Sequence, residues 1–336
     1  MRSDKILLAH GSGGKLSHEL VTSIFLPIFD NHILNQLDDR AEIEVSGIRL
    51  AFTTDSFVVN PVFFPGGDIG KLAVCGTVND LAMGGAEPLY LSAGFIIEEG
   101  FPVNELIEIT ASMKKTADKC GVKIVCGDTK VVEKGSVDKI YINTSGIGTV
   151  PDGVNISGKL ARPGDKVIVN GFIGDHGIAV MAERQGLSFR NKIVSDCAPL
   201  NGLVSKMLEV SKNIHVLRDP TRGGVATTLN EIASQSEMGI VLVEEEIPVR
   251  EQVQAACDIL GFDPLYVANE GKLLAIVPAD IAGEMLMAMR KHPLGADSKI
   301  IGEIVSENPG RVVLHTSIGG RRIVDMLVGE QLPRIC

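Results

Sequence analysis

Three aspartates in the first half of the chain stand where predicted strands or helices end, and together they could bind a divalent cation. Asp55 and Asp128 each follow a β-rich run, and Asp80 lies in the last turn of a predicted helix. An acid in the last turn opposes the helix dipole, so Asp80 costs stability unless a cation offsets its charge. Mg²⁺ usually takes one or two carboxylates together with phosphate oxygens and water. The set of three predicts a Mg²⁺-nucleotide site, although each aspartate alone is more typical of a turn or a cap.

Two glycine-rich segments near these acids could offer backbone amides to a phosphate. Gly11-Ser12-Gly13-Gly14 precedes Lys15 and a run of helical period, so the loop leads into a helix N-terminus. It is not a Walker A loop, because Leu16 follows the lysine where Ser or Thr is required, and it is not a GxGxxG loop. A flexible turn explains this loop equally well. The second segment, Gly66-Gly67-Asp68, leads into another predicted helix that carries Lys71.

A further segment, Gly127-Asp128-Thr129-Lys130, follows a predicted strand at residues 122–126. Open α/β sheets bind their ligands at the carboxyl ends of strands. We therefore expect this segment to contribute to the nucleotide site.

The last residue, Cys336, carries a thiol that could be loaded at one place and unloaded at another. The alternative is a frayed terminus with an incidental thiol. Without an export signal or a Cys-x-x-Cys pair, the six cysteines should stay reduced and bind no structural zinc. Those in apolar or helical runs are expected to pack as small hydrophobic side chains: Cys75, Cys120, Cys126 and Cys257.

The predicted elements alternate between strand and helix, which indicates a two-domain α/β or α+β protein. A chain of 336 residues with 45% hydrophobic residues is long enough for two cores. Helical periodicity occurs near residues 16–28, 72–83, 103–120, from 174, 223–234, 250–260 and 280–291. Strand patterns occur at residues 48–54, 122–126, 139–144, 166–170, 240–243, 273–277 and 299–305.

We divide the chain into four parts. Residues 1–45 are expected to form a glycine-rich loop and helix, residues 46–155 a first domain, and residues 156–320 a second domain. Residues 321–336 have no strong period and are expected to extend from the body as a mobile tail that carries Cys336.

The formal net charge of -10 argues against nucleic acid and anionic membranes as partners, because both favour a basic surface. No apolar window approaches the roughly 20 residues of a membrane span, and the start of the chain does not read as a signal peptide. We expect a cytoplasmic protein with small-molecule or protein partners.

Several motifs resemble the aminoimidazole-ribonucleotide (AIR) synthetase superfamily, also called PurM-like, which includes selenophosphate synthetase and thiamine-monophosphate kinase. They are HGSGGK, FTTDSFV, FPGGDIGKLAVCGTVNDLAMGGAEP and CGDTKVV in the first half, and GDHG, RDPTRGGV and ANEGKL in the second. Selenophosphate synthetase has a reactive Cys or selenocysteine in its N-terminal loop, whereas this loop has His10. The terminal Pro-Arg-Ile-Cys resembles the branch of hydrogenase maturation factors. The resemblance implies a two-domain fold that dimerises through its N-terminal domain.

The resemblance also implies a reaction. A carbamoyltransferase, HypF, would S-carbamoylate Cys336, and ATP with Mg²⁺ would drive dehydration of the thiocarbamate to a thiocyanate. The HypC–HypD complex would accept the cyanide for the iron of [NiFe]-hydrogenase. Asp55, Asp80 and Asp128 would hold Mg²⁺ and the triphosphate, and the glycine segments would supply amides.

Further residues receive roles only from this resemblance. Lys130 could neutralise the phosphoryl group during transfer, or be an exposed lysine at a strand end. Glu270 is the candidate proton acceptor, or a turn acid. His10, His176 and Arg222 could also line the site, while His18 and His292 lie in predicted helices and are expected to be structural.

Two other functions remain open at this point. The chain could be a superfamily synthetase or kinase that acts on a free small molecule. It could instead be a non-catalytic, nucleotide-responsive scaffold whose tail docks a partner.

Overall fold

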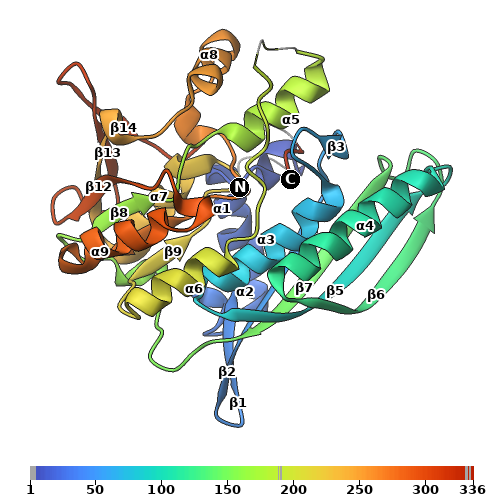
Figure 1. Ribbon diagram of the computed structural model, residues 1–336, viewed down its shortest axis with the longest axis horizontal. Coiled ribbons are helices and arrows are strands. Elements are labelled where there is room, and N and C mark those ends of the chain that lie inside the picture. Colours follow the sequence, from blue (N-terminus) through green and yellow to red (C-terminus); the bar gives the residue numbers. More distant parts are fainter. Residues whose placement is uncertain (1–4, 188, 190, 330–331, 333) are drawn as a thin grey trace.

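Two β-sheets with helices packed against them form the molecule (Figure 1). The computed structural model describes residues 5–187, 189, 191–329, 332 and 334–336. The first sheet has the order β1-β2-β7-β5-β6 and the second the order β14-β13-β10-β12-β8-β11-β9. A short hairpin, β3 (Phe63–Phe64) with β4 (Gly67–Asp68), stands apart from both sheets. The predicted α/β architecture is confirmed.

The first sheet is built from the first half of the chain, and only its β5–β6 pair is parallel. Residues alternate along its central strands, so that Thr53 is buried beneath the helices while Phe52 and Thr54 are exposed on the other face. The strands are β1 (Ala41–Val45), β2 (Ile48–Phe57), β5 (Glu87–Glu98), β6 (Lys123–Val132) and β7 (Ile140–Thr149).

Helices α3 (Ile69–Met83) and α4 (Val103–Cys120) cover one face of this sheet (Figure 1). Asp68 caps α3, because its carboxylate accepts hydrogen bonds from the amides of Gly70 and Lys71. Gly121 ends α4 in the left-handed conformation, with φ of 75°. Both helices begin and end close to the predicted positions.

The second sheet is built from the second half of the chain and is mixed, with β10–β13 parallel and its other pairs antiparallel. Its strands are β8 (Lys166–Val169), β9 (Val216–Arg218), β10 (Gly239–Val243), β11 (Leu274–Val277), β12 (Lys299–Val305), β13 (Val312–His315) and β14 (Arg321–Val324). The predicted strands at 166–170, 240–243, 273–277 and 299–305 are confirmed.

Helices on the two sides of the second sheet complete the core. One hydrophobic cluster joins the sheet to α6 (Asn201–Val210), α9 (Ala279–Arg290) and the end of α3, and another joins it to α7 (Gly224–Ser236). A third cluster packs α5 (Asp175–Gln185) against α8 (Glu251–Leu260). Because α3 belongs to the first sheet and α6 to the second, their contact joins the two halves.

The predicted N-terminal helix is present in three short pieces. They are α1 (Lys15–Leu20), a π-helical turn (Val21–Phe25) and α2 (Leu26–Phe29). Several of its large apolar side chains are exposed, among them Ile28 and Phe29. No helix in the described part of the chain is long and apolar enough to cross a bilayer.

The end of the chain differs from the extended tail that we predicted. Residues 321–324 form β14 at an edge of the second sheet, and the last residues return to the body beside α5 and β3 (Figure 1). Pro333 of the Pro-Arg-Ile-Cys ending lies outside the described residues. Ile335 is 3% exposed and packs in the core of the first domain. The chain end is therefore docked.

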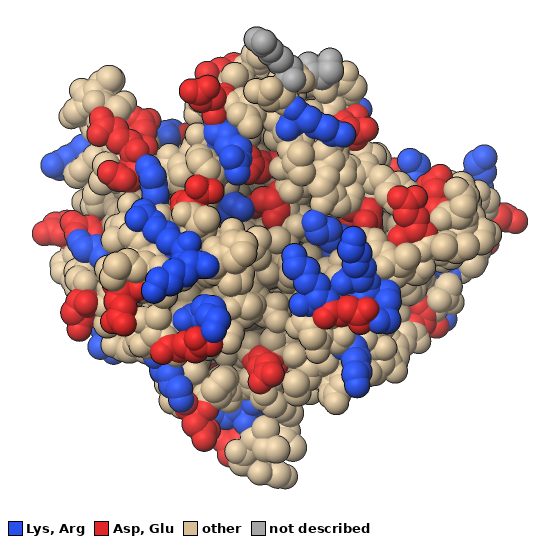
Figure 2. Space-filling model, in the orientation of Figure 1, with Lys and Arg blue, Asp and Glu red and all other residues tan. Residues whose placement is uncertain are grey.

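Acidic and basic side chains are interspersed over the face of the molecule in Figure 2. This distribution gives the face no continuous area of one sign.

Candidate active site

A polar pocket of about 270 Å³ lies between the two halves of the chain and contains the terminal thiol. Strand β2 and helix α3 supply one wall, and the loop after β9 together with α7 supplies the other. Its ionisable side chains are Cys336, Arg218, Arg222 and the carboxylates of Asp39, Asp55, Asp80, Asp219, Glu231 and Glu270. Two of the three predicted metal ligands, the candidate proton acceptor and the candidate carrier thiol thus meet in one place.

Asp55 and Asp80 face the pocket from adjacent elements of the first domain. Burial raises the pKa of the Asp80 carboxyl well above its usual value, and the charges of Asp219 and Asp55 raise it further. The Thr53 hydroxyl donates to Asp80 at 2.9 Å and partly opposes this rise. Burial also raises the pKa of Asp55, while Arg222 lowers it. The two acids repel each other, so a cation between them would stabilise the fold.

Two aspartates that the sequence did not single out, Asp39 and Asp219, lie in the same pocket. Burial raises the pKa of Asp219 to about 8, with a further rise from Asp39 and a reduction from Arg218. Burial raises the pKa of Asp39 to about 6, although Arg218 lies 2.7 Å from its Oδ1 atom. Arg218 also pairs with Glu231 at 2.8 Å.

Arg222 supplies positive charge beside the thiol. The charge of Cys336 in its ionised form, followed by that of Asp55, raises the pKa of Arg222 despite burial. Its backbone lies against Gly13, where an added Cβ would be 2.6 Å from the Arg222 Cβ. Gly13 has φ of +79°, so both its conformation and its close contact favour glycine.

Cys336 itself is held as a neutral thiol. Burial raises its pKa to about 12; Arg222 lowers it, and Glu270 and Asp55 raise it. A thiolate is the nucleophilic form of cysteine, so the docked thiol is a poor nucleophile. The pocket suits a neutral group on the sulfur better than a free thiolate.

Glu270 enters the pocket from a loop that two buried side chains position. Asp196 accepts hydrogen bonds from the amides of Glu270 at 3.1 Å and Gly271 at 3.3 Å, and Asn79 of α3 donates to the Glu270 carbonyl at 3.4 Å. Burial raises the pKa of Glu270 well above its usual value. Its Oε1 atom is buried without a hydrogen-bond partner among the described residues. The raised pKa favours the protonated carboxyl in this pocket and makes the carboxylate, once it is ionised, a stronger base.

The pocket fits a divalent cation that is shared with phosphate oxygens. The buried Oδ2 atom of Asp39 lacks a hydrogen-bond partner in the described chain, and the pKa values of Asp55, Asp80 and Asp219 are all raised. Within the described residues, no group of three or more His, Cys, Asp or Glu side chains could hold a metal ion by itself. Mg²⁺ with few carboxylates and several phosphate or water ligands matches this arrangement.

Of the N-terminal glycine loop only Gly13 lines the pocket, and the Gly11 carbonyl accepts a hydrogen bond from the Arg222 guanidinium at 3.3 Å. The amide of Gly13 donates to the Ser17 hydroxyl at 2.9 Å, and the amide of Lys15 donates to the Leu327 carbonyl at 2.9 Å. Gly14 packs so closely on Leu327 that an added Cβ would lie 2.3 Å from its carbonyl oxygen. Gly11 and Ser12 do not line the pocket, and the Ser12 hydroxyl lies 3.3 Å from the Gly329 carbonyl. Part of the loop thus holds the segment that leads to the tail.

The second glycine segment builds a hairpin outside the pocket. Gly66 packs against Ser195, Asp68 is the α3 cap, and the Lys71 ammonium donates to the Gly66 carbonyl at 2.7 Å. Neither these residues nor Gly67 line the pocket.

The segment Gly127-Asp128-Thr129-Lys130 lies on β6, which is an edge strand with exposed residues. Asp128 and Lys130 form an exposed ion pair at 2.7 Å, which lowers the pKa of Asp128. One chain therefore does not bring Asp128 or Lys130 to Asp55 and Asp80.

None of the four histidines considered in the sequence lines the pocket, and within the described residues only His176 hydrogen-bonds to the tail. His176 is fully buried near the tail, but His10 accepts from the Leu7 amide and does not line the pocket. His292 caps a short 3₁₀ turn and His18 lies in α1.

Most of the predicted cysteine positions agree with the structure. Cys75, Cys120 and Cys257 are buried, as expected, and all six cysteines are free. Cys126 was predicted to be packed but is exposed, because β6 is an edge strand without a covering layer.

The sequence missed residues whose roles depend on tertiary contacts. Asp219 lies inside the RDPTRGGV motif and could have been found there, because it stands between Arg218 and Arg222 in the sequence. Asp39, Asn79 and Asp196 lie in stretches whose local pattern gives no such signal.

Comparisons with known proteins agree with this geometry. Residues 37–150 match the family model described as AIR synthase related protein, N-terminal domain, and residues 162–315 match its C-terminal domain.

Relatives match over the whole chain. The carbamoyl dehydratase HypE of Azotobacter vinelandii is 52% identical over 336 residues, which cover 100% of this chain and 98% of the relative. A crystal structure of a HypE–HypF complex has 53% identity and a TM-score of 0.88, covering 92% of this chain and 99% of that chain. A crystal structure of HypE in complex with ATP has 51% identity and a TM-score of 0.84, covering 99% and 100%. The chain belongs to the carbamoyl dehydratase HypE family, within the AIR synthase related proteins.

Proposed function

We propose that the chain uses ATP to dehydrate a carbamoyl group on its own Cys336, and so supplies the cyanide ligand for the iron of [NiFe]-hydrogenase. The observation that carries this proposal is the docked thiol, which shares a pocket with Arg222, Glu270 and two aspartates suited to Mg²⁺. An enzyme for a free small molecule would leave this space open for its substrate. Here the terminal thiol itself lines the space.

The reaction balances as a phosphoryl transfer followed by an elimination. The thiocarbamate oxygen of Cys336-S-C(=O)NH₂ attacks the γ-phosphorus of ATP, and ADP leaves. The C–O bond then breaks with loss of inorganic phosphate, and the nitrogen gives up its two protons over the sequence. Cys336-S-C≡N remains. Positioning and stabilisation of charge dominate catalysis of such transfers.

The pocket residues take separate parts in this sequence. Arg222 would stabilise negative charge on the phosphorylated oxygen, because it lines the same pocket as Cys336. Glu270 would accept a proton from the carbamoyl nitrogen. Asp55 and Asp80 would hold Mg²⁺, which when bound neutralises charge on the phosphates. The pocket of about 270 Å³ is too small for a whole nucleotide, so the adenosine would lie outside it.

A homodimer would complete the site. The uncovered face of the first sheet and its edge strand β6 expose large apolar side chains, which is typical of an interaction surface: Phe52, Tyr90, Ile96, Val125 and Val131. In a dimer through this face, Asp128 and Lys130 of one chain could reach the pocket of the other. Their exposure in one chain supports this arrangement.

The docked tail also implies partners outside the pocket. Carbamoylation requires Cys336 to leave the pocket, because the thiol is held neutral there. HypF is proposed as the carbamoyl donor, since a relative of this chain was crystallised in a HypE–HypF complex. The HypC–HypD complex is proposed as the acceptor of the cyanide. Dependence on ATP is in keeping with a cytoplasmic reaction.

Mass spectrometry of the Cys336 peptide tests the reaction. The carbamoylated protein is incubated with Mg-ATP, and the peptide should lose the mass of one water. A variant that lacks Ile335 and Cys336 should still bind ATP but form no thiocyanate. A carbamoylated peptide whose mass does not change would refute the proposal and favour a non-catalytic scaffold. Turnover of a free substrate by the truncated variant would favour a synthetase or kinase.

A further inference from the structure

We propose that His176 is a positioning residue that, together with Ser195, docks the chain end in the one register that brings Cys336 to Glu270. This inference rests on the proposed function for its catalytic consequence, but the docking itself is testable without ATP.

The tail docks through its backbone. The amide of Val58 donates to the Cys336 carbonyl oxygen at 3.0 Å, and the amide of Asn60 donates to the Arg334 carbonyl at 3.2 Å. Residues 334–336 therefore run antiparallel to residues 58–60, directly after β2, with the spacing of a β-ladder. Backbone pairing fixes direction, but it tolerates a slip along the strand unless side chains specify the register.

The carbonyl of Ile335, between the two paired residues, points away from this ladder and meets His176. The His176 Nε2 atom lies 2.8 Å from the Ile335 oxygen, and its Nδ1 atom lies 2.8 Å from the Ser195 hydroxyl. Ser195 Oγ also accepts from the Cys197 amide at 3.1 Å. The serine proton is thus free to be donated to Nδ1, which leaves the proton of neutral His176 on Nε2 for the Ile335 carbonyl.

The surroundings hold His176 in this tautomer and orientation. The imidazole is fully buried, which lowers its pKa and favours the neutral ring. Phe64 of the β3–β4 hairpin packs edge-to-face on it with ring centroids 5.4 Å apart. The amide of Ser195 donates to the Pro65 carbonyl of the same hairpin at 2.8 Å. The β3–β4 hairpin, for which phosphate binding was predicted, therefore supports the two residues that hold the docked tail.

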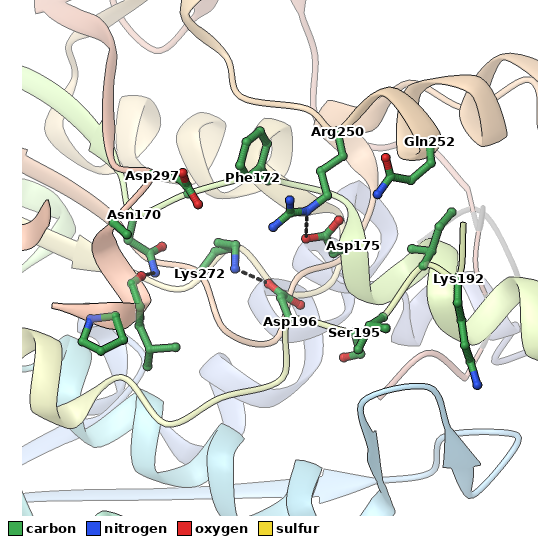
Figure 3. Close-up of a pocket in the computed structure, with 16 residues that line it drawn as sticks. Asn170, Phe172, Asp175, Lys192, Ser195, Asp196, Arg250, Gln252, Lys272 and Asp297 are labelled. Carbon is green, nitrogen blue, oxygen red and sulfur yellow. Dashed lines mark hydrogen bonds and ion pairs between the residues drawn. The ribbon is translucent and has the colours of Figure 1, made fainter. Parts of the chain in front are cut away.

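The register matters because the same loop positions the proposed base. Ser195 contacts His176, while its neighbour Asp196 binds the amides of Glu270 and Gly271. Both line the wall of a cavity of about 410 Å³, in which Asp196 pairs with Lys272 (Figure 3). Residues 195–196 thus connect the residues that hold Cys336 to the loop that carries the Glu270 carboxylate.

Ile335 and Arg334 also hold the tail. The Arg334 guanidinium donates to the Val58 carbonyl at 2.9 Å and pairs with Asp138, so it supports the same register. The Ile335 side chain is buried in the first-domain core, and Arg184 donates to the Arg334 carbonyl at 2.7 Å. Burial of an isoleucine favours docking, yet a hydrophobic pocket alone allows small displacements. A single buried hydrogen bond to the Ile335 carbonyl is lost by a slip of one residue, because that carbonyl would then face the other side.

Alkylation of Cys336 measures docking directly. The unmodified protein is treated with iodoacetamide without nucleotide, and the Cys336 peptide is followed by mass spectrometry over time. In His176→Ala and in Ser195→Ala the tail should undock more often, so alkylation should be about tenfold faster than in wild type. His176→Gln keeps an N–H donor and should be closer to wild type. The rate at which carbamoyl-Cys336 is converted to thiocyanate should fall most in His176→Ala and Ser195→Ala and least in His176→Gln.

The control variant is His215→Ala. His215 is also buried in the second domain and pairs with Asp165 at 2.7 Å, and it has no hydrogen bond or ion pair with the described residues of the tail. Its loss should lower the melting temperature and leave alkylation of Cys336 unchanged. Wild-type alkylation rates in folded His176→Ala and Ser195→Ala would overturn the proposal, as would equal acceleration in His215→Ala. Faster alkylation with unchanged ATP-dependent conversion would refute the catalytic consequence only.

Discussion

The Nε2 atom of His176 lies 2.8 Å from the carbonyl oxygen of Ile335, although the two residues are 159 positions apart in the chain. This contact joins the first turn of α5 to the penultimate residue. Ser195 contacts the other ring nitrogen, and burial lowers the pKa of His176 and favours the neutral imidazole. The position of the terminal thiol therefore depends on a histidine that is not in the pocket itself.

The first prediction concerns pH. Burial holds the pKa of His176 below the usual value of a histidine, about 6.5, so the unfolded chain binds a proton at this site more readily than the folded chain. The neutral His176 contributes fully to the free energy of unfolding above about pH 6.5. This contribution is lost as the pH falls toward the lower pKa of His176 in the folded state. Melting temperatures measured by circular dichroism should therefore fall more steeply below pH 6.5 in wild type than in His176→Gln. Parallel curves would show that His176 does not titrate in this way.

The second prediction concerns the hydrophobic anchor. Ile335 is 3% exposed, and burial of such a side chain is worth about 1.5–3 kcal/mol. Ile335→Ala should release the tail, so a carboxypeptidase should remove Cys336 about tenfold faster than from wild type. Ile318→Ala is the matched control, because Ile318 is 94% exposed. Equal digestion of all three proteins would mean that the side chain does not hold the tail.

The third prediction concerns charge in the pocket. Asp80→Asn removes a carboxylate whose neighbours raise its pKa, so the melting temperature without Mg²⁺ should be unchanged or higher. The gain in melting temperature on addition of Mg-ATP should shrink, and conversion should slow at least tenfold. Asp280→Asn, on an exposed part of α9, should behave as wild type. If Asp80→Asn converts carbamoyl-Cys336 at the wild-type rate, Asp80 has no role in binding Mg²⁺ and is only an acid at the end of a helix.

The fourth prediction concerns the proton acceptor. Glu270→Gln keeps the size of the side chain but removes its basicity, so thiocyanate formation should fall by about 10²–10⁴-fold. Binding of ATP, measured by calorimetry, should remain, since the loop is held through backbone amides by Asp196. Glu284→Gln on the exposed side of α9 is the control. A small loss of rate in Glu270→Gln would assign the proton to another group.

The fifth prediction concerns a shared site in the proposed homodimer. Lys130→Ala removes only an exposed ion pair, so it should change the melting temperature little. If Lys130 of one chain serves the pocket of the other, mixing inactive Lys130→Ala with inactive Glu270→Gln should restore conversion. Such mixed dimers contain one pocket with both intact residues. Mixtures as inactive as their components would contradict the shared site.

Local patterns predicted many of the helices and strands, because the chain marks their ends clearly, but they missed β5 and α6. Asp68 and the glycines around α3 and α4 are caps in the structure, and the apolar period of α4 matches its buried face. The strands of the second sheet follow apolar runs that are buried on both faces, as in β11. Cys336 could be singled out because terminal thiols are unusual in company with these motifs.

The sequence could not predict what depends on contacts between distant segments. The glycines of the hairpin are needed for close approach to Ser195, which no local pattern distinguishes from a phosphate loop. The tail lacks periodicity because its partner, residues 58–60, lies in the other half of the chain. Asp128 and Lys130 stand at the end of a predicted strand, but the pattern does not reveal that this strand is an edge.

The antiparallel pairing of residues 334–336 with residues 58–60 has a consequence for kinetics. On the proposed reaction the substrate is a covalent part of the enzyme, so each chain completes one turnover per loading. The observed rate should be first order and independent of protein dilution as long as the dimer persists, with saturation only in ATP. The steady-state rate of cyanide delivery would then be set by how fast partner proteins carbamoylate Cys336 and remove the cyano group from it.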